Sequence, residues 1–192
     1  MKSNEHTADL AAEDSSAAEK TVYRVVIRAP IDKVWAELIR TDEVLPFFFN
    51  AVCKTTGLRK GAPIRMQSKD GRYTSVVGDV VKFEPPYRYS HTFRFTQFDD
   101  PWCTVHYVLK EVEGGTEFTL INENVPAGTQ TEKYMTQGGD FITANLKAVV
   151  ETGQPTFGGR FALLMMGAFS ILTPARCRSE HWPLDRQFDN NQ

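Results

Sequence analysis

The stretch DGRYTSVVGDVVKFEPPYRYSHTF, residues 70–93, decides the fold class, because apolar and polar residues alternate in it between turn signals. Asp70-Gly71 and Pro85-Pro86 mark the turns and predict two strands, 72–84 and 87–97. The short link between these strands predicts an antiparallel hairpin. Because successive side chains of a strand point to opposite faces, four residues should share the inward face of the second strand: Tyr89, His91, Phe93 and Phe95.

The same period of two extends to both sides of this hairpin. It predicts further strands at 21–28, 52–56, 62–69, 102–112 and 116–124. Short turns join neighbouring strands, so we expect a curved antiparallel sheet with one apolar face. The residues predicted to point inward from the last two strands are Cys103, Val105, Tyr107, Leu109, Phe118, Leu120 and Asn122.

Two short helices are predicted after the first strand. Pro30 suits the first turn of a helix in IDKVWAELIR, residues 31–40, whose apolar residues recur at helical spacing. Thr41-Asp42 can cap a second helix that runs through Leu45.

A long helix is predicted over residues 129–151, with Gly153 ending it. The pair Gly138-Gly139 inside this segment predicts either a kink or the close approach of another element, since each glycine costs about 1 kcal/mol relative to alanine. The order of elements indicates an α+β fold in which the long helix covers the apolar face of the sheet and leaves a cleft.

Composition bounds the possible functions. The chain has 192 residues, 41% of them hydrophobic, and a formal net charge of −2, so no basic field calls for nucleic acid. Residues 1–20 lack the apolar core of a secretory signal and are predicted to form a disordered tail. Three widely spaced cysteines indicate a cytoplasmic setting. We expect one domain at 21–153 and a C-terminal extension at 154–192.

The extension contains the uncharged run FALLMMGAFSILTPA, residues 161–175. A membrane-spanning helix needs about 20 apolar residues, so this run is too short for a span. Its apolar residues surround the whole helix, which is typical of a helix buried on more than one side. We therefore expect it to pack outside the domain, to form an interface with a protein partner or a second copy, or to close one mouth of the cleft.

Four segments in this order resemble the START-like (SRPBCC) superfamily, in the branch named after the activator of the Hsp90 ATPase. They are IRAPIDKVWAEL, DGRYTSVVGDVVKFEPPYRYSHTF, VHYVLKEVEGGTEFTLINEN and GGDFITANLKAVVETG. Within them, Gly78, Val80 and Pro85 match a G-x-V-x-x-x-x-P element, Gly114 to Thr116 a GGT hairpin, and Leu146-Lys147 the L-K near the end of the long helix. The family usually carries tryptophan where this chain has Gly139-Asp140 or Phe141.

The resemblance implies a helix-grip fold, in which the sheet wraps around the long helix and encloses a cavity. Members bind hydrophobic molecules, cyclise polyketides or stimulate a chaperone, and no family-wide catalytic motif can be carried over. With the inward positions above, this fold predicts a ligand cavity formed by Phe47, Phe48, Met66, Tyr89, His91, Phe93, Val105, Tyr107, Leu120, Asn122, Tyr134 and Phe141.

The inward polar groups are the candidates for chemistry, because a buried polar group must find a partner. They either satisfy one another in the core or orient a ligand. In an enzyme, His91 would act as acid or base, and Tyr107 or Asn122 would hold a carbonyl or enolate oxygen. The sequence has no metal-binding spacing, nucleotide-binding motif or nucleophile elbow, so no metal and no cofactor are expected.

The sequence thus favours a non-catalytic protein that binds a small hydrophobic molecule. Two alternatives stay open: a co-chaperone-like activator that acts through its surface, and a polyketide cyclase or dehydratase that uses the polar residues of the cavity.

Overall fold

The computed structural model describes residues 20–168, 173–186 and 188. The predicted N-terminal tail therefore lies outside the described residues, except for Lys20. The strands are β1 Lys20–Ile27, β2 Val44–Leu45, β3 Ala51–Thr55, β4 Pro63–Gln67, β5 Thr74–Glu84, β6 Arg88–Phe95, β7 Cys103–Val112 and β8 Gly115–Glu123. The helices are α1 Ile31–Leu38, α2 Gln130–Thr152 and α3 Phe157–Ala168, followed by short 3-10 turns at Ala175–Cys177 and Ser179–His181.

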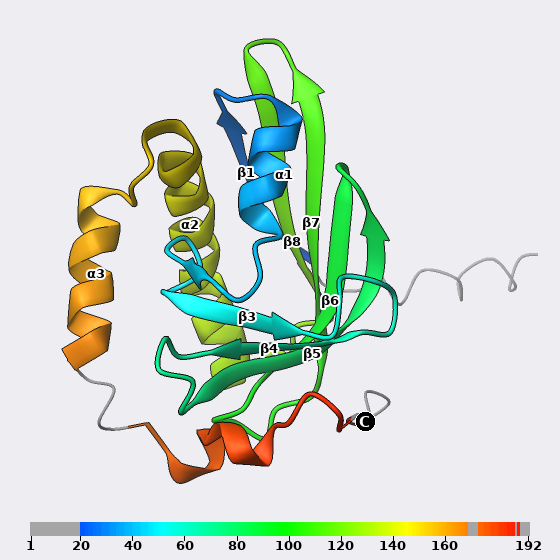
Figure 1. The fold of residues 1–192 in the computed structure, drawn as a ribbon, viewed down its shortest axis with the longest axis vertical. Coiled ribbons are helices and arrows are strands. Elements are labelled where there is room, and N and C mark those ends of the chain that lie inside the picture. Colours follow the sequence, from blue (N-terminus) through cyan, green and yellow to red (C-terminus); the bar gives the residue numbers. More distant parts are fainter. Residues whose placement is uncertain (1–19, 169–172, 187, 189–192) are drawn as a thin grey trace, which may run out of the picture.

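The strands form one curled antiparallel sheet that wraps around α2 (Figure 1). The order across the sheet is β1-β8-β7-β6-β5-β4-β3-β2, so the first strand of the chain closes one edge beside the last. Helices α1 and α2 cover the concave face, and α3 stands apart on the far side of α2 (Figure 1). The predicted α+β helix-grip architecture is confirmed.

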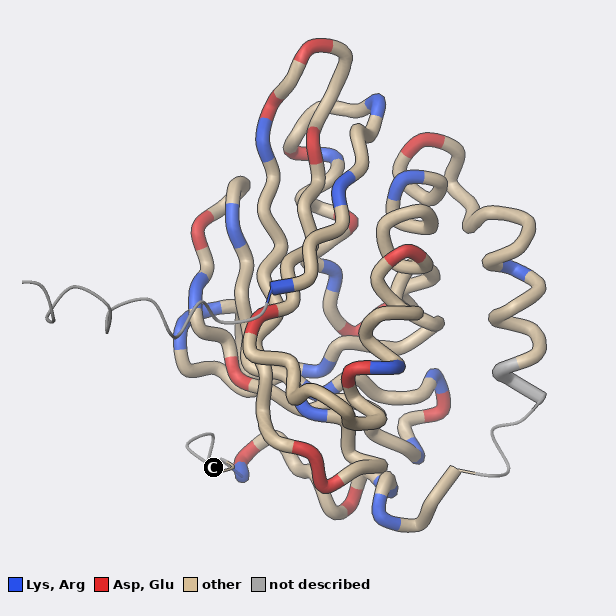
Figure 2. Tube along the Cα trace, turned by 180° about the vertical axis from the view of Figure 1, so that it is seen from behind, with Lys and Arg blue, Asp and Glu red and all other residues tan. Residues whose placement is uncertain are grey.

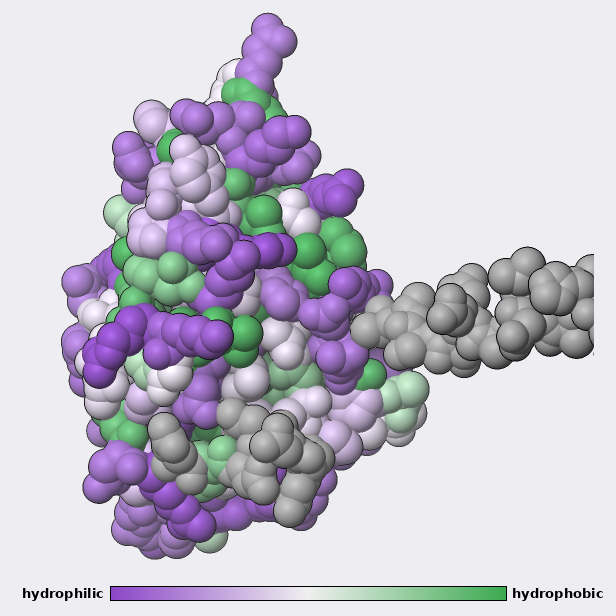
Figure 3. Space-filling model, turned by 90° about the vertical axis from the view of Figure 1, so that its right-hand side faces the viewer, coloured by the Kyte–Doolittle hydropathy of each residue, from purple (hydrophilic) through white to green (hydrophobic). Residues whose placement is uncertain are grey.

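The concave face carries the core. Every inward residue predicted for β6, β7 and β8 is buried except Phe95, which is half-buried. Leu146 of α2 is fully buried against this face, and Ile142 and Met135 lie beside it in the same cluster. The opposite side of the sheet is mostly hydrophilic, with hydrophobic patches between polar residues (Figure 3).

The predicted second short helix through Leu45 is wrong. Val44 and Leu45 form β2, which pairs with Val52 and Ala51. Asp42 has φ 61°, a left-handed conformation that a right-handed helix excludes, and its N–H donates to the Cys53 carbonyl at 3.0 Å. The side chain of Asp42, expected to help cap this helix, instead accepts a hydrogen bond from Lys54 Nζ at 2.7 Å.

The glycine pair of α2 is explained by close packing, because α2 runs without a break from residue 130 to 152. A Cβ atom on Gly139 would lie 2.2 Å from the ring of Tyr23 in β1. Two residues further, Phe141 stacks on Phe49 with ring centroids 4.4 Å apart. Tyr23 and the Phe49–Phe141 pair thus make the contact at the place where the family usually has tryptophan.

The C-terminal turns of α2 are tied to β1 by two side chains. Lys147 Nζ donates to the Val26 carbonyl at 2.6 Å, and Glu151 accepts from the backbone N–H of Arg28 at 2.6 Å. Lys147 and Glu151 also pair with each other at 2.6 Å. These contacts give the Leu146-Lys147 motif a physical reason: leucine enters the core and lysine fastens the helix to the sheet edge.

We expect the unfolding free energy of Glu151→Gln to fall less at acid pH than that of the wild-type chain. The Arg28 N–H and then Lys147 lower the pKa of Glu151 below its ordinary value of 4.5. A carboxyl whose pKa is depressed on folding contributes stability that is present above the unfolded pKa and is lost as the pH falls through the folded one. Urea unfolding between about pH 6 and pH 3 should therefore show a smaller loss for Glu151→Gln than for wild type. Glu113→Gln, in the exposed β7–β8 turn, is the control, and an equal loss in all three proteins would contradict this.

The segment after α2 folds back along the domain. Asn145 Oδ1 accepts hydrogen bonds from the N–H and the hydroxyl of Thr156 at 3.0 and 3.1 Å, which fixes the start of α3 beside α2. Beyond α3, residues 173–186, here called the C-terminal strap, pass beneath β4 and β5 (Figure 1). None of the described helices is long and apolar enough to cross a bilayer.

Candidate functional site

A cavity of about 400 Å³ lies between the concave face of the sheet, α2, the segment between β2 and β3, and the C-terminal strap. Strands β5 to β8 supply its floor, and α2 supplies one wall through Gly138, Gly139 and Ile142. At Gly139 the missing side chain leaves room for the Tyr23 ring, and a Cβ on Gly138 would meet the ring of Phe49, which also lines the cavity. Thr173 and Cys177 of the strap complete the wall on the opposite side.

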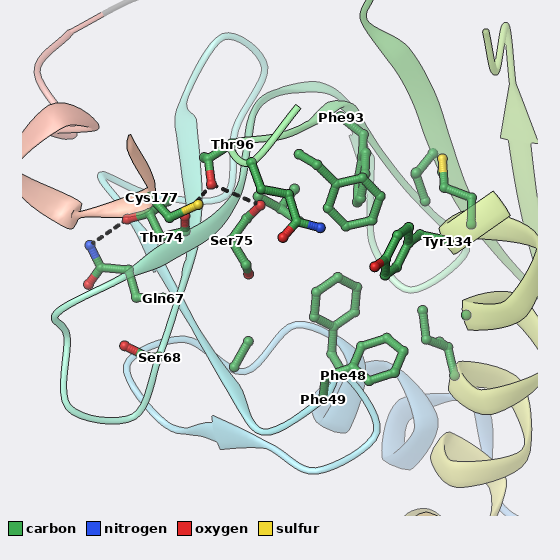
Figure 4. Close-up of a pocket in the computed structure, with 18 of the residues that line it drawn as sticks. Phe48, Phe49, Gln67, Ser68, Thr74, Ser75, Phe93, Thr96, Tyr134 and Cys177 are labelled. Carbon is green, nitrogen blue, oxygen red and sulfur yellow. Dashed lines mark hydrogen bonds between the residues drawn. The ribbon is translucent and has the colours of Figure 1, made fainter. Parts of the chain in front are cut away.

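The cavity has an aromatic side and a polar side (Figure 4). Phe48, Phe49, Phe93 and Tyr134 gather on the side that faces α2 (Figure 4). The polar side lies toward the strap and is formed by Gln67, Ser68, Thr74, Ser75, Thr96 and Cys177.

Hydrogen bonds hold the polar side in place. Gln67 Nε2 donates to the hydroxyl of Thr74 at 3.4 Å, and that hydroxyl in turn donates to Ser179 of the strap at 3.0 Å. The Thr96 hydroxyl donates to the backbone carbonyls of Thr74 and Ser75. A ligand on this side would meet hydroxyl and amide groups whose positions are fixed by the sheet and the strap together.

The described residues that line the cavity include no carboxylate, no lysine, no arginine and no histidine. Burial raises the pKa of the Tyr107 hydroxyl well above its ordinary value, so this group stays protonated at neutral pH. A charged ligand would therefore find no counter-charge in this part of the wall, and burying an unpaired charge costs several kcal/mol or more. The described wall suits an uncharged molecule with an apolar body and a hydrogen-bonding end.

The structure brings together seven of the residues predicted for the cavity: Phe48, Phe93, Val105, Tyr107, Leu120, Asn122 and Tyr134. Tyr134 is half exposed and stands at the rim, where its ring contacts Phe95 and Phe98. Phe47, Met66 and Tyr89 lie instead around a separate void of about 10 Å³ under α1. Phe141 packs on Phe49 outside the cavity wall.

His91 is also placed outside the cavity wall. It is fully buried, and its ring is tilted against those of Tyr89 and Tyr107, with centroids 5.3 and 5.7 Å away. Nδ1 lies 2.8 Å from the carbonyl oxygen of Thr92, while Nε2 is buried without a hydrogen-bond partner among the described residues. Burial lowers the pKa of His91 to about 4, so the ring is neutral at physiological pH. The predicted acid or base thus packs against the Tyr107 ring but does not itself line the cavity, whereas Tyr107 and Asn122 do.

The buried thiols are poor nucleophiles. Burial raises the pKa of Cys53 and of Cys103 to about 12, and the thiolate is the reactive form. All three cysteines are free and buried, with Cys177 in the cavity wall. Within the described ranges, no three metal-ligating side chains gather as a site.

The sequence missed the polar side of the cavity. Thr74 and Val76 follow the period of the predicted strand 72–84, so alternation could have placed them inward. Cys177 and Thr173 carry no such signal, because they reach the cavity from an irregular segment after α3.

The strap that carries Cys177 is held by Arg65, which is fully buried on β4. Its guanidinium donates to the carbonyls of Trp182, Pro183 and Arg186 in the strap, at 3.2, 3.3 and 2.8 Å. It also donates to the carbonyls of Ile64 and Gly78 within the sheet. One side chain therefore joins the sheet to the strap at three points.

Comparison with known proteins gives a family and a fold. The family model described as "Activator of Hsp90 ATPase homolog 1-like protein" matches residues 28–151. No curated protein matched the chain.

Solved structures with this fold include DynU16, a protein in the dynemicin biosynthetic locus, at 23% identity and a TM-score of 0.57. The match covers 71% of this chain and 48% of DynU16, so the chain spans about half the length of that protein. CalU16 from Micromonospora echinospora is 21% identical with a TM-score of 0.54, over 72% of this chain and 68% of CalU16. The Aha1 dimer from Colwellia psychrerythraea is 19% identical with a TM-score of 0.56, over 70% of this chain and 98% of that one.

Proposed function

The chain belongs to the family of activator of Hsp90 ATPase homolog 1-like proteins, and within that family we propose that it binds a small, uncharged, mainly apolar molecule in the cavity. The observation that carries this proposal is the composition of the described wall, which joins an aromatic side to a polar side without a charged residue. A volume of about 400 Å³ lies in the range of small-molecule sites. The lack of a carboxylate or imidazole among the described lining residues favours binding over acid–base catalysis. The three free cysteines favour a cytoplasmic location.

Native mass spectrometry of the freshly purified chain tests the proposal directly. A defined adduct at one-to-one stoichiometry, identified after solvent extraction, would support it and would name the ligand. A clean apo mass, together with no binding of apolar probes, would contradict it.

We expect a neutral probe to bind more tightly than an acid of the same length. Decanol and decanoate share the apolar chain, but the carboxylate must be desolvated in a wall where no described residue offers a counter-charge. The affinity for decanol should therefore exceed that for decanoate by about tenfold or more, measured by displacement of Nile red. Equal affinities, or a preference for decanoate, would show that the ligand class is assigned incorrectly.

We expect Val105→Phe to weaken binding of decanol by about tenfold or more, because the larger ring would occupy the cavity floor. The cost in stability should be about 1–3 kcal/mol, since overpacking a core has this range. Val22→Phe makes the same change at an exposed position of β1 and should bind like wild type. If both variants bind decanol equally, the probe occupies another site.

A second candidate function is activation of a heat-shock-protein ATPase through the surface, which the family description favours. The same Val105→Phe variant separates the two functions. Surface activation would survive a filled cavity, whereas a ligand-dependent role would not.

Turnover of an identified ligand that is lost in Tyr107→Phe or Asn122→Ala, with binding retained, would instead favour a cyclase or dehydratase.

We also propose that α3 contacts a protein partner or a second copy of the chain. Phe157, Phe161 and Leu164 are 87%, 61% and 71% exposed. Along α3 the backbone carries a single charged position, as Figure 2 shows, and this is Arg160. If the partner is a second copy, light scattering should detect a dimer of the wild-type chain, and the double variant Phe161→Glu/Leu164→Glu should be a monomer. A wild-type chain that stays monomeric at high concentration would exclude a homodimer.

A further inference from the structure

An open groove on the outer side of the sheet is lined by three arginines, one histidine and two aromatic rings. It lies where the C-terminal strap crosses β6. Its lining residues are Arg94, Arg176, His181, Trp182, Arg186 and Phe188. It is separate from the cavity, because none of these six residues lines the cavity wall.

Sheet register and the strap build this groove. Pairing aligns Arg65, Val77 and Arg94 across β4, β5 and β6, and all three point away from the concave face. Trp182 covers this row and is itself buried, with its indole N–H donating to the Arg176 carbonyl at 2.8 Å. Arg65 fixes the strap from below, since it donates to the carbonyls of Trp182 and Arg186. The walls are therefore held by the fold.

Arg94 is held between two indole rings. Its guanidinium carbon lies 4.9 Å from the ring centroid of Trp102 and 5.8 Å from that of Trp182. Its Nε is buried and has no hydrogen-bond partner among the described residues. Arg186 enters from the strap and stacks over Phe188 at 5.0 Å. Aromatic faces support both guanidinium groups and leave their N–H groups available for an acceptor.

The groove holds more positive charge than its neighbours neutralise. Asp99 is engaged by Arg176, whose Nη1 lies 2.8 Å from a carboxylate oxygen. Glu180 lies 3.7 Å from Arg178 and 3.8 Å from His181. Within residues 20–168 and 173–186, neither Arg94 nor Arg186 has an ion-pair partner. Among the described residues, the guanidinium groups of Arg94 and Arg186 thus lie at the groove with no carboxylate in ion-pair contact.

We propose that this groove binds a phosphate-type dianion, free or carried on a larger molecule, through Arg94 and Arg186. A guanidinium presents parallel N–H donors in a fork that matches phosphate oxygens. Two such forks on one groove match the two charges of a phosphate monoester or of inorganic phosphate. The proposed phosphate site shares no residue with the proposed ligand cavity. A cavity that bound no ligand would therefore leave this proposal unaffected.

The test titrates the full chain with inorganic phosphate at low ionic strength and follows the indole N–H signals of its 3 tryptophans by NMR. Trp102 and Trp182 flank Arg94, whereas Trp35 is a buried residue of α1 and serves as the internal reference. We expect saturable shifts of Trp102 and Trp182 with Trp35 unchanged. In the double variant Arg94→Gln/Arg186→Gln, the affinity for inorganic phosphate should fall by about tenfold to a hundredfold, because the charge-assisted hydrogen bonds from both guanidinium groups are lost.

The matched control is Arg24→Gln/Arg59→Gln, which removes the same charge at exposed positions elsewhere and should bind phosphate like wild type. Arg186→Gln alone changes an exposed side chain and serves as a second variant if the first double variant is unstable. Vesicles containing phosphatidic acid form a second arm that identifies a lipid headgroup as the source of the phosphate. Binding of neither free phosphate nor these vesicles would overturn the proposal, as would binding that survives loss of Arg94 and Arg186.

Discussion

An Arg65→Met variant should unfold with a free energy about 3 kcal/mol lower than that of the wild-type chain, and its strap should detach from the sheet. Arg65 is fully buried and donates to five backbone carbonyls, three of them in the strap. Methionine fills a similar volume but donates nothing, so the three strap carbonyls must find water or stay unpaired. Hydrogen bonds to charged groups contribute about 1.5–3 kcal/mol each, and the variant no longer carries the desolvation cost of burying the guanidinium, which offsets part of the loss.

Urea unfolding measures the stability, and the fluorescence of Trp182, which the strap carries, reports its detachment. Arg65→Lys keeps the charge but offers only three donors on a flexible stem, so its stability should fall between those of Arg65→Met and wild type. Arg24→Met, at an exposed position of β1, should stay within about 0.5 kcal/mol of wild type. If Arg65→Met were as stable as Arg24→Met, the strap would have to be held by something other than this side chain.

Detachment of the strap would also open the cavity, because Thr173 and Cys177 belong to its wall. We therefore expect Arg65→Met to release decanol faster than wild type under conditions where the domain remains folded. This links a buried arginine on the outer face of the sheet to a cavity on its inner face.

The sheet and its inward face could be predicted from the sequence because they depend on local alternation. Tyr107, Leu120 and Asn122 are buried at the positions that a period of two predicts. Because tight turns join the strands, consecutive strands pair antiparallel, as β7 and β8 do. The helix predicted through Leu45 failed for a local reason, since Asp42 adopts a left-handed conformation that a capping signal does not reveal.

The parts that could not be predicted depend on contacts between distant residues. Arg65 follows the outward phase of its strand, and alternation alone would leave it in solvent, yet a segment more than a hundred residues later covers it. His91 was placed inward correctly, but inward does not mean cavity-lining, because Tyr107 and Tyr89 pack around its ring. Whether an inward side chain meets a cavity depends on how the sheet curls, and no periodicity in the sequence contains that information.

Gly139→Ala and Gly138→Ala should change stability in opposite directions, although they are neighbours in α2. Alanine stabilises a helix by about 1 kcal/mol relative to glycine, so helix propensity alone would stabilise both variants by that amount. A Cβ on Gly138 would meet Phe49 at 3.6 Å, an ordinary contact, whereas one on Gly139 would lie 2.2 Å from the Tyr23 ring. That ring is held because the Tyr23 hydroxyl donates to the Thr136 carbonyl at 3.0 Å. We expect Gly138→Ala to gain up to about 1 kcal/mol and Gly139→Ala to lose about 2 kcal/mol.

Thermal and urea unfolding of the two variants measure these changes, and Tyr23→Ala identifies their cause. In a Tyr23→Ala background the ring is gone, so Gly139→Ala should become neutral or stabilising, and the coupling between residues 23 and 139 should be about 2 kcal/mol or more. The same background should leave the effect of Gly138→Ala unchanged, because that position contacts Phe49 instead. A Gly139→Ala variant that stays destabilised without the Tyr23 ring would mean that the glycine is needed for some contact other than the close approach of β1 to α2.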